Sequence, residues 1–106
     1  MNTISREELK ARMTGSEPVQ LLMALDRKSF ERQHIPGSVQ FDQLQEAAAR
    51  LSPEQAIVVY DTNPACPASY RAYYQLHSLG FKKIYRFAGG LEEWAAAGYP
   101  IEGKGL

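Results

Sequence analysis

The chain contains few of the features that would link it to metals, nucleic acids or membranes. It has one cysteine in 106 residues, so it cannot form an internal disulfide or a cysteine-rich zinc site. Twelve basic residues balance twelve acidic ones. Without net charge or a basic stripe, the sequence gives no reason to expect a nucleic-acid or membrane partner. We also expect no metal and no organic cofactor.

Long apolar runs are also missing. Residues 1–8 lack the apolar segment of a signal peptide, and no later stretch approaches the length that spans a bilayer. We therefore expect a soluble, cytoplasmic protein. A chain of 106 residues has a normal length for one domain, so residues 1–106 are expected to form a single domain around one core.

Short apolar segments alternate with helical patterns along the chain. Runs typical of buried strands occupy residues 19–25, 39–41 and 56–60, and an amphipathic candidate strand covers residues 83–87. The helical patterns are a capping box at Ser5 and Glu8, a segment capped by Asp42 that extends to Leu51, and residues 68–79 and 91–97. Parallel strands need crossover connections, which cover the sheet faces. The alternation therefore predicts a three-layer α/β fold, with a mainly parallel central sheet of about four or five strands and helices on both faces.

The loop that follows the strand at residues 56–60 holds the candidate site. In such sheets, ligands bind at the carboxyl ends of strands, where loops meet helix N-termini. Asp61 leaves the strand directly, and Cys66 precedes Pro67 further along the loop. Pro67 suits the first position of a helix, which would make Cys66 the cap residue, with its sulfur beside free N–H groups.

Asp61 opposes a second negative charge on Cys66. A carboxylate about 4–8 Å away disfavours that charge by roughly 2–4 kcal/mol at an effective dielectric constant near 20. The helix dipole favours it by only about 0.3–1 kcal/mol in ordinary geometry. Repulsion is therefore the larger effect unless Asp61 turns away or is neutralised by Arg71 or Arg86. Asp61 also has a structural alternative, because a carboxylate can accept N–H bonds from the loop in place of a bound anion.

Four segments in order resemble the rhodanese-like domain, the fold of many thiosulfate and persulfide sulfurtransferases. They are Phe30 with HIPG at 34–37, IVVY at 57–60, LGF at 79–81 ahead of Ile84, and GGLEEW at 89–94. The resemblance implies that Cys66 carries sulfur as a persulfide, cradled by loop amides between Asn63 and Ser69. It implies a small sulfur-containing anion as donor and a thiol or persulfide as acceptor. The substrate-binding residues that it suggests are Asp61, Asn63, Ala65, Ala68, Ser69 and Arg71.

The chain departs from the family pattern where the chemistry would occur. LLMAL at 21–25 replaces a strand end that is usually charged, and Asp61 stands where the nucleophilic cysteine usually follows the strand. Two functions therefore stay open: a sulfurtransferase that uses Cys66, and a catalytically inactive module for protein interaction or ligand sensing. Tyr70 and Tyr74 share a helix face that would suit contact with a protein partner or a second copy of the chain.

Overall fold

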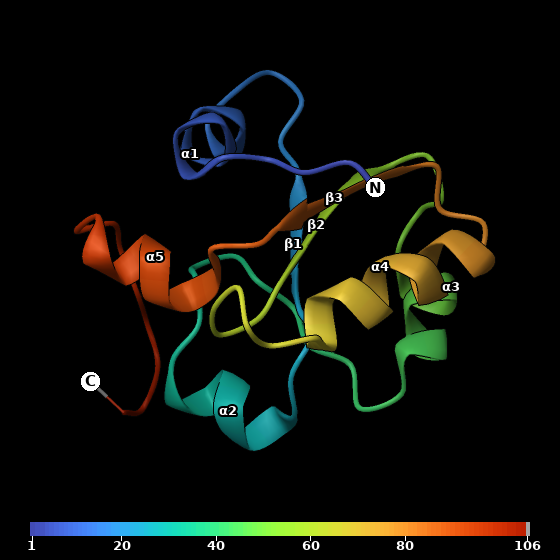
Figure 1. Cartoon of the computed structure of the whole chain (residues 1–106). Coiled ribbons are helices and arrows are strands. Elements are labelled where there is room, and N and C mark those ends of the chain that lie inside the picture. The colour runs from blue at the N-terminus through green and yellow to red at the C-terminus, as the bar shows by residue number, and fades with distance from the viewer. Residues whose placement is uncertain (106) are drawn as a thin grey trace.

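The structure is a computed structural model, and it describes residues 1–105. Helices and strands alternate along most of the chain (Figure 1). In order, the elements are α1 (Arg6–Met13), β1 (Gln20–Met23), α2 (Arg27–Arg32), the 3-10 helix η1 (Leu44–Glu46), α3 (Ala47–Arg50), β2 (Ala56–Tyr60), α4 (Ala68–Ser78), β3 (Lys83–Phe87) and α5 (Gly90–Ala96). Among the described residues, no helix combines the length and apolar character needed to cross a bilayer.

The central sheet is parallel, with β2 between β1 and β3. Single bridges extend it at both edges: Val39 pairs with Leu22 of β1, and Thr3 pairs with Arg86 of β3. These bridges take the places of outer strands in the expected sheet of four or five. The candidate strand at 39–41 is thus reduced to one bridge, because beyond Val39 the side-chain amide of Gln40, rather than a backbone amide, reaches the carbonyl of Leu25.

Each face of the sheet is covered by helices, as Figure 1 illustrates. On one face, alternate strand residues such as Val58 and Tyr60 pack with Leu9 of α1 and Trp94 of α5. On the other face, the intervening strand residues pack with α3 and α4; this cluster includes Leu22, Ile57, Val59, Ile84, Ala47, Ala72 and Leu76. The period-two alternation of a strand divides the side chains between the two clusters. The three-layer α/β fold predicted from the sequence is confirmed.

Helix ends follow the sequence at some positions and depart from it at others. Ser5 caps α1, and its side chain accepts the N–H of Glu8 at 3.1 Å. Asp42, predicted to cap a helix, instead forms an exposed ion pair with Arg27 at 2.8 Å. The next helical segment, η1, begins at Leu44. The partner of Asp42 is distant in sequence, so local pattern alone could not reveal it.

Candidate functional site

Asp61 lies fully buried at the carboxyl end of β2, between that strand and the N-terminus of α4. Its Oδ2 accepts the backbone N–H of Ser69 at 2.6 Å. Its Oδ1 is also buried and has no hydrogen-bond partner within the described residues. Ser69 is the second residue of α4, and its N–H belongs to the first helical turn, which has no partner within the helix. The carboxylate therefore satisfies a free amide where the helix dipole favours negative charge.

Helix α5 holds the start of the loop by its backbone. The N–H of Leu91 donates to the carbonyl of Asp61 at 2.8 Å, and the N–H of Glu92 donates to the carbonyl of Thr62 at 2.9 Å. This close approach requires glycine at residue 90, where φ is +67° and a Cβ would lie 2.5 Å from the carbonyl oxygen of Asp61. The side chain and the backbone of Asp61 are thus bound by different helices.

The middle of the loop is a turn organised by Asn63. Its Oδ1 accepts the N–H of Ala65 at 3.0 Å, and its carbonyl accepts the N–H of Cys66 at 3.1 Å. Its side-chain amide also donates to Glu92 at 3.3 Å. Three of the loop amides expected to cradle a sulfur species, those of Ala65, Cys66 and Ser69, therefore already donate within the protein.

Arg86 of β3 lies beneath the loop and binds it at two points. Its Nε donates to Oγ of Ser69 at 2.8 Å, and a terminal guanidinium nitrogen donates to the carbonyl of Cys66 at 3.4 Å. The sequence suggested a role for Arg86 only as a group that might neutralise Asp61. The available signal was its place in the sequence, as a charged residue near the end of the amphipathic run at 83–87. In the structure Arg86 pairs in register with Val59, close to the loop.

Cys66 is a free, partly buried thiol in this loop. It is not the helix cap that the sequence predicted, because Pro67 takes the N-cap position and α4 begins at Ala68. Pro67 has backbone angles of the α region, with φ −86° and ψ −1°, although α4 begins at Ala68, one residue later than predicted. The side chain of Arg71 is exposed on α4.

The tyrosines of α4 divide between the core and the surface. Tyr73 is buried, and its hydroxyl accepts the backbone N–H of Asn2 at 2.9 Å. Tyr70 and Tyr74 are exposed, and their rings meet edge to face at 5.2 Å. The inward orientation of Tyr73 is confirmed, while the role of the other two tyrosines as a contact surface stays a prediction.

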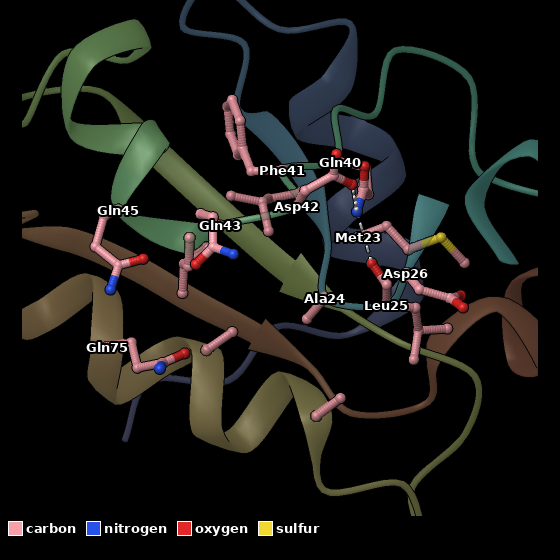
Figure 2. A pocket seen from close by; sticks show the side chains of 14 residues that line it. Met23, Ala24, Leu25, Asp26, Gln40, Phe41, Asp42, Gln43, Gln45 and Gln75 are labelled. Carbon is pink, nitrogen blue, oxygen red and sulfur yellow. Dashed lines mark hydrogen bonds between the residues drawn. The ribbon is translucent and has the colours of Figure 1, made fainter. Parts of the chain in front are cut away.

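A cavity of about 490 Å³ opens beside the loop, at the carboxyl end of β1 (Figure 2). Its walls are residues 22–26, residues 40–45, and Ala68, Ala72 and Gln75 of α4. Ala68 is the only residue of the predicted site among those lining it. The cavity and the Asp61 loop therefore adjoin the N-terminal part of α4 but are distinct.

The chain belongs to the rhodanese-like domain family, whose model matches residues 5–97. It is similar to the crystal structure of the Alr3790 protein from Anabaena sp., with 30% identity, coverage of 94% of this chain and 80% of that chain, and a TM-score of 0.84. It is also similar to the BH2092 protein from Bacillus halodurans, with 24% identity, coverage of 98% of this chain and 78% of that chain, and a TM-score of 0.89. A rhodanese-related protein from Thermoplasma volcanium is 20% identical, with coverage of 96% of this chain and 98% of that chain, and a TM-score of 0.80. No curated protein matches the chain. The family resemblance seen in the sequence is thus confirmed.

Proposed function

We propose that this protein is a rhodanese-like binding module in which Asp61 takes the place of a bound anion and no sulfur transfer occurs at that position. The supporting observation is the 2.6 Å hydrogen bond from the N–H of Ser69 to the buried carboxylate. A helix N-terminus is a ready binding site for an anion. Here the anion is a side chain of the protein, and a carboxylate is not a sulfur nucleophile.

The surroundings of Asp61 disfavour a second anion in the loop. A substrate charge about 4–8 Å from the carboxylate would be repelled by roughly 2–4 kcal/mol at an effective dielectric constant near 20. The amides of Ala65 and Cys66 donate to Asn63, so they are not available to offset that repulsion. Arg86 donates to Ser69 and to the carbonyl of Cys66. The donors around the loop are thus engaged within the protein.

Removing the carboxylate should create an anion site. The Asp61→Ala variant is expected to lose about 1.5–3 kcal/mol of unfolding free energy, the usual contribution of a hydrogen bond to a charged group. Sulfate should then restore stability by occupying the vacated space beside the N–H of Ser69. At sulfate concentrations about 10 to 100 times its dissociation constant, the gain is about 1.4–2.7 kcal/mol. Urea unfolding at several sulfate concentrations measures it.

The matched control is Asp42→Ala, which removes an exposed carboxylate that pairs with Arg27 and accepts no N–H group of α4. Sulfate also stabilises proteins weakly by its exclusion from their surfaces. That general effect should be equal in the wild type, Asp42→Ala and Asp61→Ala. An equal response of all three proteins would show that Asp61 does not substitute for an anion.

A second function is favoured by the partial exposure of Cys66 in a loop just before a helix. As a persulfide carrier, its thiolate would attack the outer sulfur of thiosulfate. The new S–S bond forms as the S–S bond of thiosulfate breaks, and sulfite leaves with the electron pair. An acceptor thiolate or cyanide would then take the outer sulfur and release the Cys66 thiolate.

Mass spectrometry after incubation with thiosulfate separates the two functions. The binding-module proposal expects no added sulfur. A gain of one sulfur atom that a reductant removes, and that is absent from Cys66→Ser, would replace that proposal with the carrier function. An adduct that persists in Cys66→Ser would exclude Cys66 as the carrier.

A further inference from the structure

The cavity at the end of β1 has a mixed lining in which polar surface exceeds apolar surface. Leu22 and Ala72 of its wall are buried, and Phe41 is partly buried and packs against the same core cluster. A volume of about 490 Å³ is in the range of small-molecule sites, which combine apolar walls with a few polar groups. The position also suits a ligand, because the carboxyl ends of parallel strands commonly border binding sites.

Side-chain amides provide much of the polarity of the cavity. Gln40 donates from its amide to the carbonyl of Leu25 at 3.1 Å and to Asp42 at 3.3 Å (Figure 2). Gln45 and Gln75 extend toward the gap between η1 and α4 from its two sides. Both are exposed, and each carboxamide offers donors and an acceptor. An amide-like ligand can match both kinds of group at once.

The charges on the rim are negative. Asp26 and Asp42 line the cavity, and none of its described lining residues is lysine, arginine or histidine. The hydrogen bond from Arg27 lowers the pKa of Asp42 below its ordinary value, with a smaller contribution from Gln40. The hydrogen bonds from Ser29 lower the pKa of Asp26. Both carboxylates are therefore ionised at neutral pH.

The residues around the rim do not reverse this charge. Arg27, outside the cavity wall, is paired with one rim carboxylate and also lies in the field of Glu31 and Glu46. Lys28 acts on Asp26 from the first turn of α2. These interactions thus involve two cations, Arg27 and Lys28, and four carboxylates, those of Asp26, Asp42, Glu31 and Glu46. The cavity therefore disfavours an anion and accepts a neutral or positively charged group.

We propose that this cavity binds a small molecule that carries amide-like hydrogen-bonding groups and is neutral or cationic. The apolar side chains of the wall contact the body of the ligand, and the glutamine amides and rim carboxylates bind its polar end. The inference gives a ligand class to the binding module proposed above. It depends on that proposal only in treating the protein as a binder, because Asp61 does not line the cavity.

Three probes of nearly equal shape and different charge test the inference: benzamidine, benzamide and benzoate. Titrations of each into the 106-residue chain, followed by 1H–15N NMR, give dissociation constants and locate the site. We expect benzamidine to bind most tightly, benzamide next, and benzoate about tenfold more weakly than benzamidine. The shifts should involve residues 22–26, residues 40–45 and the side-chain amide of Gln75.

Variants connect the binding to the cavity. Asp42→Asn should weaken benzamidine by up to about fivefold, as expected for an exposed charge, and leave benzamide nearly unchanged. Gln75→Leu should weaken the binding of both benzamidine and benzamide. The control is Gln55→Leu, because Gln55 precedes the amino end of the central strand β2, whereas the cavity opens at the carboxyl end of β1, and Gln55 does not line the cavity. It should bind both probes as the wild type does.

Three results would overturn the inference. One is the absence of any shift at the lining residues with all three probes at millimolar concentrations. Another is benzoate binding as tightly as benzamidine, and a third is equal loss of binding in Gln75→Leu and Gln55→Leu. None of these results would affect the sulfate test of Asp61, so failure of the ligand inference and failure of the binding-module proposal are distinguishable.

Discussion

The Gly90→Ala variant is expected to have a free energy of unfolding about 2–4 kcal/mol lower than that of the wild type. An alanine at φ +67° is strained, and its Cβ would lie 2.5 Å from the carbonyl oxygen of Asp61 and 2.8 Å from that of Thr62. Both neighbours are backbone atoms, so no side chain can move aside. Relief requires α5 to move away from the loop, which would also lengthen the bond from the N–H of Leu91 to Asp61. Urea unfolding measures the loss.

Gly98→Ala is the matched control for this variant. Gly98 also has a positive φ, +78°, but a Cβ there would meet nothing within 4 Å. It should therefore lose only the conformational contribution, about 1–2 kcal/mol. Equal losses in the two variants would mean that the contact with the loop carbonyls does not constrain Gly90.

Trp94→Ala should have the largest effect of the substitutions considered, a loss of about 3–5 kcal/mol, as for other large buried aromatic residues. Trp94 is 1% exposed and packs edge to face against Phe87 and Tyr99, with ring centroids 6.2 and 4.7 Å away. Its indole N–H donates to the carbonyl of Pro100 at 2.8 Å. The truncation leaves a cavity between α5 and the sheet and removes that donor. Thermal and urea unfolding would both report it.

Two other substitutions serve as comparisons for the loss of unfolding free energy in Trp94→Ala. Trp94→Phe keeps an aromatic ring but loses the indole donor, and it should fall between the wild type and Trp94→Ala. Tyr74 is 46% exposed, so Tyr74→Ala should lower the free energy of unfolding by about 1 kcal/mol or less. If Trp94→Ala were no more destabilising than Tyr74→Ala, α5 would not be anchored through Trp94.

Local pattern was sufficient for the elements that have strong sequence signals. The apolar run at 56–60 and the amphipathic run at 83–87 coincide with β2 and β3. The Ser5 cap was also predicted correctly. In each case the determining interactions are periodicity or contacts within one turn, which a single sequence records.

The details of the site could not be obtained in the same way. The sequence indicated that Asp61 might accept loop N–H groups, but its burial and the choice of Ser69 as donor depend on how α4 packs on the sheet. The contacts of Arg86 and the bonds from α5 to the loop join residues far apart in sequence. Pro67 misled the prediction of the cap, because its fixed φ suits an N-cap in the α region as well as the first helical position.

Asp61 joins two helices that lie on opposite faces of the sheet. Its side chain holds the first turn of α4 through Ser69, and its carbonyl holds the first turn of α5 through Leu91. Separation of either helix from the sheet must break a bond to the same residue. We therefore expect the first turns of the two helices to open together. A partner that binds one helix would then also stabilise the other.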